Sequence, residues 1–396
     1  MQLNRVINRN QMQLPTQQKG VALLIALMVA ALISVIAIEL SWQFDLSITR
    51  SGNRWQGIQA NTYLDASENL AVKVLTNDLN NQDSKNDNLG ELWATQKPQF
   101  PTDHGYIAGS LEDASARFNL NSLGGQPPKG AENAFDAKKY NEPQRRFIRL
   151  LQTIENEEGV PFLQLQEAQA IAESVIDWVD VNTSETGFGG AEGDYYQQLN
   201  PPFVIANDVM SSVSELSLIK GMTPEIYRRL VPLVIALPAN VTLNVNTAPE
   251  ALLRTINYEN DLMPLSKSDV QRLLADRQNN PSGFDSCNDF VAQGTEAAVL
   301  FPVTIGGTEQ NSGNQGNTPE QASGDQGNTP EQGSANPEVN QQQNKMDMTG
   351  LGTASDYFIL SSETMVGDHI RTRKTLLKRE KNTRTVLPVR RTDANF

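Results

Sequence analysis

The sequence predicts an α+β fold that begins with one long helix, and three observations lead to this prediction. Residues 21–38 form an apolar run without a charged side chain. Strand-like segments lie at 106–123 and 356–380, and neither has enough strands for a stable sheet by itself. The residues between them mostly show helical periodicity. We therefore expect one antiparallel sheet built from both ends of the chain, interrupted by a large inserted α-helical domain.

The composition restricts the kinds of partner. The 396 residues carry a net charge of −14. Residues 367–396 contain nine basic and three acidic side chains, so the body that precedes them is strongly acidic. Such a body repels nucleic acid and anionic lipid headgroups, and it suits cations or basic partner surfaces. Cys287 is the only cysteine, so no disulfide can form within the chain.

The apolar run is long enough to cross a membrane. Eighteen helical residues span roughly 27 Å, which is close to the thickness of a bilayer core. The basic residues near the N-terminus lie before the run, which favours residues 1–20 on the cytoplasmic side and the bulk of the chain on the other side. We expect a transmembrane helix over 21–40.

Two interpretations of the N-terminus stay open. In one, the chain keeps an uncut anchor. In the other, a peptidase cuts between Gly20 and Val21, where a glycine lets the backbone of the substrate approach closely. The stretch QKG followed by VALLIALMVAALI resembles the signal of type IV pilins and pseudopilins, in which a prepilin peptidase cuts after the glycine. This resemblance implies that residues 1–20 are a cleaved leader.

The apolar helix is expected to continue as an amphipathic helix to about residue 80. Apolar residues recur at helical spacing from Ala60 to Leu79, with polar and charged residues between them. Gly52 and Gly57 are the positions at which this helix could be interrupted. A helix that is first apolar and then amphipathic resembles the one through which pilins pack into a fibre.

The middle of the chain combines helical segments with one segment of low complexity. Helical periodicity is clear at 142–154, 166–179 and 267–278. Residues 306–345 have almost no apolar side chains and repeat QGNTPEQ. Nothing there can offset the entropy that is lost when a chain is ordered, so this segment is predicted to be a flexible linker.

These observations predict six consecutive parts, and the boundaries follow the changes in pattern described above. The first two parts concern the membrane, and the other four make up the soluble bulk. The parts are a leader at 1–20, a transmembrane helix at 21–40, the first portion of the αβ domain at 41–125, the inserted helical domain at 126–304, a disordered low-complexity linker at 305–348, and C-terminal strands that complete the αβ domain at 349–396.

Two stretches, 216–234 and 243–256, resemble helix-hairpin-helix units, which usually grip DNA phosphates through backbone amides. Gly221 occupies the tight turn of the first stretch, but Thr223 stands where a second glycine is usual. Few basic residues surround the pair, and phosphate binding without neutralising charge is weak. We therefore favour a structural scaffold over DNA binding.

The segment 177–203, DWVDVNTSETGFGGAEGDYYQQLNPPF, crowds acidic residues into a glycine-rich loop. Gly189 and Gly190 allow this loop to fold back. Hard cations such as Ca²⁺ prefer many oxygen ligands, and acids that are held close together without a cation repel one another. A solvated acidic loop is the alternative. The candidate ligands are Asp177, Asp180, Asn182, Glu185, Glu192 and Asp194.

Several of these stretches together resemble one family. DWVDVN with GAEGDYYQQLNPPF, ELSLIKGMTPEIYRRLVP, NVNTAPEALL and the terminal SDYFILSSETMV are similar to the K-type minor pseudopilins of type II secretion (general secretion pathway protein K). The resemblance covers nearly the whole chain except 306–345. It implies a pilin-like αβ domain interrupted by a large α-helical domain, with calcium bound to the acidic residues named above. Asn182 stands where relatives often have Asp, which removes one charge from that site.

The resemblance also implies a role at the tip of a periplasmic pseudopilus that helps initiate assembly and export folded proteins across the outer membrane. It implies a single-pass protein of the bacterial inner membrane with its bulk in the periplasm. The acidic charge of the body argues against a nucleic-acid partner. In pilins the fifth mature residue is generally Glu, which neutralises the N-terminal amine of a neighbour; here it is Ile25, which fits a tip position. The implied partners are other minor pseudopilins (I and J types, then H type), the major pseudopilin, the prepilin peptidase, secreted exoproteins and the outer-membrane secretin.

The sequence does not indicate an enzyme. His104 and His369 are the only histidines and lie in unrelated contexts, and the H-E-x-x-H, P-loop and G-x-S-x-G patterns are absent. Cys287 fits a buried small apolar residue. The alternative functions are a membrane-anchored DNA-uptake protein that uses the hairpins, and a minor pilin at the tip of a type IV pilus.

Overall fold

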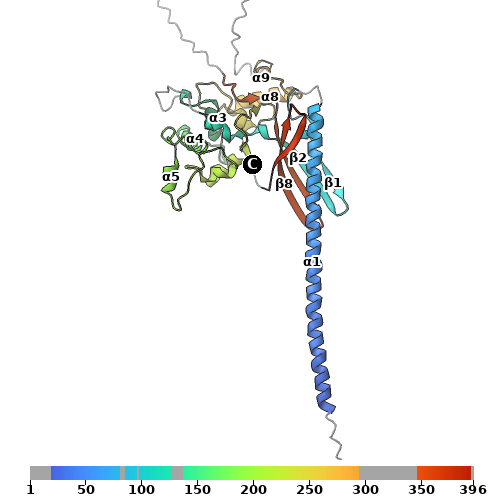
Figure 1. Cartoon of the computed structure of the whole chain (residues 1–396). Helices are drawn as coiled ribbons and strands as arrows, with labels where there is room; N and C mark the ends of the chain where they lie inside the picture. Colours follow the sequence, from blue (N-terminus) through green and yellow to red (C-terminus); the bar gives the residue numbers. More distant parts are fainter. Residues whose placement is uncertain (1–18, 81–84, 96–97, 126–136, 294–345, 394–396) are drawn as a thin grey trace, which may run out of the picture.

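A computed structural model describes residues 19–80, 85–95, 98–125, 137–293 and 346–393 (Figure 1). The first element is α1 (Lys19–Asn80), a helix of 62 residues that extends well beyond the rest of the molecule. It continues without a break through Gly52 and Gly57, so the interruption considered at these positions does not occur. Its N-terminal part is long and apolar enough to cross a membrane. Residues 1–18 of the expected leader lie outside the described residues.

The prediction of one antiparallel sheet from both ends of the chain is confirmed. The sheet has the order β1-β2-β7-β8-β9, and every neighbouring pair is antiparallel. The pairing of β2 with β7 runs from Gly105 opposite Val366 to Asp113 opposite Phe358, so the two ends of the chain meet in the middle of the sheet. The five strands are β1 (Gln99–Thr102), β2 (Gly105–Asp113), β7 (Tyr357–Val366), β8 (His369–Glu380) and β9 (Thr385–Thr392).

One face of the sheet packs against α1. The alternation of β7 turns Phe358 and Leu360 toward Ala71 and Leu75 of α1, and Trp93 of the short helix α2 (Leu92–Thr95) closes this core. Polar contacts run along the same side of α1, and they occupy much of the basic charge of the C-terminal segment. These contacts are Arg371 with Asn61, Arg373 with Asp65, Arg391 with Glu68, and Arg379 with Asp78.

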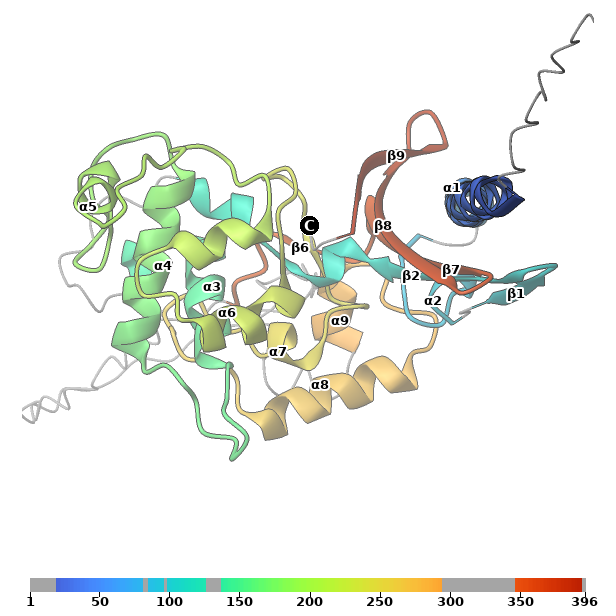
Figure 2. The same ribbon diagram turned by 90° about the horizontal axis from the view of Figure 1, so that it is seen from below.

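The other face of the sheet is partly covered by the segment that lies between β2 and β7 in the chain. Figure 2 shows α1 on one side of β7 and β8 and the helices of this segment on the other side. Ile359 and Leu376 of the sheet pack against Ile235 and Leu237. The helices of the segment are α3 (Glu142–Gln152), α4 (Leu165–Val179), α5 (Gly193–Gln197), α6 (Pro224–Leu230), α7 (Glu250–Leu253), α8 (Lys267–Asn279) and α9 (Cys287–Gln293).

The three segments with clear helical periodicity form α3, α4 and α8. The start of α3 is set locally, because Asn141 and Gln144 form a capping box and a proline lies in its first turn. Short helices and two-stranded pairs complete the segment. These are the 3-10 helices at Ala114–Ala116, Leu120–Gly124, Ala137–Lys139, Val213–Leu218 and Val231–Leu233, the parallel pair β3 (Phe118–Asn119) with β4 (Val234–Ile235), and the parallel pair β5 (Leu243–Asn244) with β6 (Leu351–Gly352).

The expected boundary at residue 125 is too late. Phe118, Leu120 and Leu123 are buried in the core of the helical segment, so the part that belongs to the sheet ends near Asp113. The sequence did not show where the sheet part ends, because 106–123 looks strand-like throughout. Within it, β3 is extended like β2, but it pairs with β4 and not with the five-stranded sheet.

Residues 126–136 and 294–345 lie outside the part of the chain that the structure describes. The second range contains most of the predicted linker, 305–345. The last three residues of the expected linker, 346–348, are packed against the helical segment. Asp347 is buried and accepts hydrogen bonds from Arg145 of α3. The end of the linker was therefore placed a few residues too late.

Candidate metal centre

The glycine-rich acidic loop is attached to the end of α4 by a buried carboxylate. Asp177 lies in the last turn of α4 and is fully buried. Its Oδ1 accepts a hydrogen bond from the backbone N–H of Thr186 at 2.9 Å, and its Oδ2 accepts one from the N–H of Ala191 at 2.7 Å. One side chain therefore holds two distant points of the loop.

The expectation that the glycines let the loop fold back agrees with the close contacts at Gly190. A Cβ at Gly190 would lie 2.3 Å from Oδ2 of Asp177 and 2.6 Å from the carbonyl oxygen of Thr186. Gly189 donates its N–H to Glu173 of α4 at 2.7 Å. The loop can approach α4 this closely only because these positions have no side chain.

Three of the candidate acids, Asp177, Asp180 and Glu192, are buried, and their charges act on one another. Burial, followed by the negative charge of Asp177, raises the pKa of Asp180 to about 6. Burial also raises the pKa of Glu192, and the charges of Asp177 and Asp180 add to this increase. The carboxyl groups therefore repel one another when all three are ionised, and a bound cation would relieve the repulsion.

Two oxygen atoms at or beside these acids have no hydrogen-bond partner among the described residues. Oε1 of Glu192 and Oδ1 of Asn207 are both buried and unsatisfied within this part of the chain. The amide nitrogen of Asn207 donates to the carbonyl oxygen of Asn182 at 2.9 Å and to Oε2 of Glu192 at 3.5 Å. Buried oxygens of this kind, beside three acidic groups, fit the oxygen ligands that a hard cation such as Ca²⁺ requires.

The other three candidate ligands, Asn182, Glu185 and Asp194, lie outside this group of buried acids. The amide nitrogen of Asn182 donates to Asp180 at 2.7 Å, and its side-chain oxygen accepts from Ser184 at 2.8 Å, so this side chain orients Asp180. Glu185 and Asp194 have exposed side chains and do not join the buried group.

Asn207 is a member of the buried group that sequence reasoning missed. The only local signal was an asparagine followed by an aspartate. The backbone of Asn207 has a positive φ of 45°, which asparagine tolerates better than most residues. The side chain of Asn207 meets Glu192 across 15 positions of sequence and Asn182 across 25, and nothing in the sequence pattern indicates these contacts.

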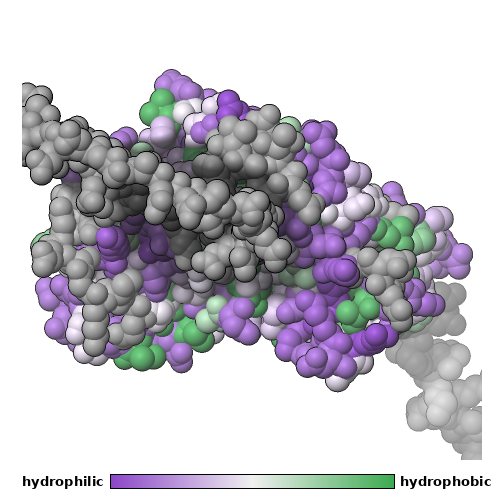
Figure 3. All heavy atoms as spheres, turned by 90° about the horizontal axis from the view of Figure 1, so that it is seen from above, coloured by the Kyte–Doolittle hydropathy of each residue, from purple (hydrophilic) through white to green (hydrophobic). Residues whose placement is uncertain are grey.

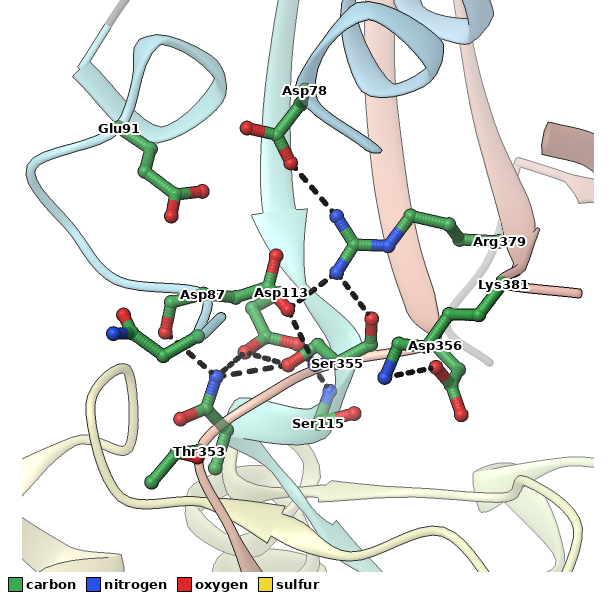
Figure 4. Close-up of polar contacts among 12 residues, drawn as sticks. Asp78, Asp87, Glu91, Asp113, Ser115, Thr353, Ser355, Asp356, Arg379 and Lys381 are labelled. Carbon is green, nitrogen blue, oxygen red and sulfur yellow. Dashed lines mark hydrogen bonds and ion pairs between the residues drawn. The ribbon is translucent and has the colours of Figure 1, made fainter. Parts of the chain in front are cut away.

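A second acidic group was not predicted. The carboxylates of Asp78, Asp87 and Glu91 lie within 4.8 Å of one another. Figure 4 shows Arg379 reaching from β8 to this group. Its guanidinium donates to Asp78 at 2.8 Å, to Asp87, and to the carbonyl oxygen of Ser355 at 2.6 Å. A fixed positive charge is thus already present, so this group is an ion-pair network that joins α1, β8 and the loop before α2.

The hairpin-like stretch 216–234 has its basic side chains engaged within the protein. Gly221 has a φ of +82° in the turn, and Thr223 caps α6 by accepting the N–H of Ile226. Arg228 and Arg229 both pair with Glu225, and Lys220 contacts backbone carbonyls of the acidic loop. Thr223 therefore stands at the second glycine position because that position is a helix N-cap.

The two histidines are closer in the structure than their sequence contexts indicate. The ring of His104 lies 5.7 Å from the ring of Trp55, and Nε2 of His369 lies 3.3 Å from Oδ1 of Asn53. Both therefore contact α1 at the same end of the sheet, which corrects the view that their contexts are unrelated. Cys287 is half-buried, and burial raises the pKa of its thiol.

Comparison with known proteins identifies the family. Two family models described as "Type II secretion system (T2SS), protein K" match residues 116–239 and 243–302. Type II secretion system protein K of Aeromonas hydrophila is 36% identical over 267 residues, which cover 66% of this chain and 76% of the relative. The chain belongs to the type II secretion system protein K family. The family is a structural component of a secretion system, which confirms the resemblance stated from the sequence.

Other relatives and a solved structure agree with this assignment. Type II secretion system protein K of Pseudomonas aeruginosa is 32% identical over 285 residues, which cover 70% of this chain and 78% of the relative. A chain in the crystal structure of the GspK-GspI-GspJ complex from enterotoxigenic Escherichia coli matches with a TM-score of 0.59 and 23% identity. The match covers 88% of this chain and 99% of that chain, so the fold is shared along nearly the whole length.

Proposed function

We propose that this protein is a minor pseudopilin at the tip of the type II secretion pseudopilus, where it helps initiate assembly and export folded proteins across the outer membrane. The observation that carries the proposal is the exposed apolar half of α1 on a chain of the protein K family. Large apolar side chains from Val21 to Ile58 are exposed on this helix. They require a membrane or a bundle of other helices around them. We propose no catalytic role.

The proposed location is the inner membrane, crossed once, with the bulk of the chain in the periplasm. Among the described residues, α1 is the one helix that is long and apolar enough to cross a membrane. We further propose that a prepilin peptidase cuts between Gly20 and Val21. Gly20 is exposed in the first turn of α1, and a Cβ there would meet nothing within 4 Å, so the fold itself does not require glycine. A requirement of the peptidase would explain it.

The tip position is supported by α1 and by the shape of the molecule. Ile25 is exposed and cannot neutralise the amine of a neighbouring subunit, and the first acid after the proposed cut is Glu39, roughly 20 Å further along the helix. The helices between β2 and β7 lie at the end of the molecule opposite the N-terminus of α1 (Figure 1). Seen from that end, the described residues that Figure 3 leaves visible are mostly hydrophilic, with scattered hydrophobic side chains. Such a surface suits solvent better than a further subunit.

The proposed partners are the minor pseudopilins of the same secretion system. The chain of similar fold was solved as a GspK-GspI-GspJ complex, which makes the I and J types the first candidates. The H-type and the major pseudopilin would follow along the fibre, and the secretin and exoproteins would be met at the tip. Co-purification of the full-length chain with the I- and J-type subunits in detergent tests the proposal. A chain that never co-purifies with either subunit would contradict it.

We also propose that the helical segment between β2 and β7 acts as an inserted domain with a hairpin-type scaffold, and that calcium binds in it. Asp177, Asp180, Glu192 and Asn207 would hold the ion, which supplies the positive charge that the buried acids lack. A cation that binds only the folded state adds roughly 2.7 kcal/mol at about 100 times its dissociation constant. Chelation should therefore lower the melting temperature, and Asp180→Ala should remove most of that effect. Equal melting temperatures with calcium and with chelator would refute the site.

A further inference from the structure

We propose that Lys220 is a positioning residue for the cation site, so that the hairpin-like stretch 216–234 is coupled to cation binding in the acidic loop. The inference rests on the calcium site proposed above. It concerns a residue that lies outside the loop and contributes no ligand to the ion.

Lys220 reaches from the hairpin to the backbone of the loop. Its Nζ donates to the carbonyl oxygen of Gly189 at 3.2 Å and to that of Gly190 at 3.0 Å. The ammonium also lies 5.0 Å from the centre of the Tyr195 ring, and the backbone N–H of Lys220 donates to the hydroxyl of Tyr196. Both tyrosines belong to α5, which begins directly after Glu192. The lysine therefore contacts the loop on both sides of that acid.

The peptide groups that Lys220 holds are the ones that set the position of the acids. The carbonyl of Gly189 accepts from Lys220, and the N–H of the same peptide, that of Gly190, donates to the carbonyl oxygen of Thr186. The carbonyl of Gly190 also accepts from Lys220, and the N–H of that peptide, that of Ala191, donates to Asp177. A rotation of these peptides would break the bond between Ala191 and Asp177. It would also move the residue that follows Ala191, which is Glu192.

Two consecutive glycines need an external restraint. Glycine populates more backbone conformations than any other residue, so Gly189 and Gly190 lose the most entropy when the loop is ordered. Close contacts forbid a side chain at either position. The ammonium of Lys220 supplies the restraint from outside, because a hydrogen bond from a charged donor is stronger than one from a neutral donor.

The hairpin is itself fixed to the helix that carries Asp177. A Cβ at Gly221 would lie 3.0 Å from Cγ1 of Ile171, so the turn of the hairpin packs directly on α4. Lys220 is the residue before Gly221, and α4 ends at Val179, two residues after Asp177. The hairpin thus bridges α4 and the loop, which are the two parts between which the cation is proposed to bind.

The test measures cation affinity in the full-length chain, purified in detergent. Calcium binding is followed by calorimetry, and Tb³⁺ serves as a luminescent probe that is excited through Trp178, the buried neighbour of Asp177. Lys220→Met should weaken calcium binding roughly 10- to 100-fold, as is typical when a group that orients metal ligands is removed. Lys220→Arg should retain most of the affinity, because a guanidinium keeps the positive charge and has N–H donors for the same carbonyls. Arg228→Met is the matched control, since Arg228 lies in the same hairpin and is largely exposed.

The outcomes separate this inference from the site on which it rests. No binding by the unaltered chain would overturn both. Binding by the unaltered chain with the same affinity in Lys220→Met would overturn the role of Lys220 alone. If Lys220→Met does not fold, amide hydrogen exchange of the unaltered chain, measured with and without calcium, tests the coupling between the hairpin and the loop. Calcium should slow the exchange of the amides at 219–222 together with those of the loop, and protection of the loop alone would contradict the coupling.

Discussion

Arg379 joins three parts of the protein, so its replacement by methionine should be strongly destabilising. The side chain is 4% exposed and its partner Asp87 is 3% exposed. The guanidinium also donates to Asp78 at 2.8 Å and to the carbonyl oxygen of Ser355 at 2.6 Å. Methionine keeps the apolar stem of the side chain, but it leaves Asp87 buried beside Asp78 without the guanidinium.

The expected loss follows from this burial. Removing one partner of a buried ion pair costs about 3–5 kcal/mol, because the remaining charge is left uncompensated. An exposed ion pair is worth about 0–1 kcal/mol. The pair of Arg117 with Glu112 is of the second kind, since Glu112 is 51% exposed. Arg379→Met should therefore lower the free energy of unfolding several times more than Arg117→Met.

Urea unfolding of the full-length chain in detergent, followed by near-UV circular dichroism, measures both variants. A double variant with Asp87→Asn supplies the internal check. The neutral amide removes the uncompensated charge, so the double variant should recover at least half of the loss. The reasoning is refuted if Arg379→Met is no worse than Arg117→Met, or if the added Asp87→Asn recovers nothing.

Three further predictions concern pH, the acidic loop and the N-terminus. Burial, as the main cause, raises the pKa of Asp113 from 3.8 to about 6 in the folded protein, so the folded state binds the proton more tightly than the unfolded state. The contribution of Asp113 to the free energy of unfolding should therefore fall as pH rises from about 4 through 6. When the free energy of unfolding is measured with urea at several pH values, its plot against pH should be flatter for Asp113→Asn than for the unaltered chain. Gly190→Ala should weaken calcium binding in calorimetry, because the new Cβ would lie 2.3 Å from Asp177, whereas Gly193→Ala, whose Cβ would be 3.7 Å from its nearest neighbour, should bind normally. Gly20→Val should leave the fold intact and block processing; N-terminal sequencing that still finds a cut after residue 20 would contradict the proposed role of the glycine.

Local patterns explain what could be predicted about the fold. The periodicity of α4 and α8 and the alternation of β7 are properties of short stretches, and the capping box of α3 lies within four residues. The interruption considered in α1 failed for a physical reason. A single glycine costs a helix about 1 kcal/mol, which is a small loss for 62 residues, and Gly57 lies close to the side chain of Arg371.

Contacts between distant residues explain what could not be predicted. Asn207 approaches Glu192 only after the chain has turned back, and Arg379 meets Asp78 across 301 positions of sequence. Nothing in one sequence shows which residues will meet at such separations. The acidic loop could be recognised because its acids lie close together in the chain, but the unsatisfied oxygens that favour a cation are found only when the loop is folded onto α4.

The position of this subunit in the fibre is the central claim, and disulfide crosslinking in assembled pseudopili tests it most directly. Single cysteines are placed on exposed positions along α1, such as Ser47 and Ser51, in a chain in which Cys287 is replaced by serine. The account predicts crosslinks to other pseudopilins below this subunit, and one copy of the chain in each fibre. Crosslinks between two copies of this chain, or copies repeated along the shaft, would contradict a position at the tip.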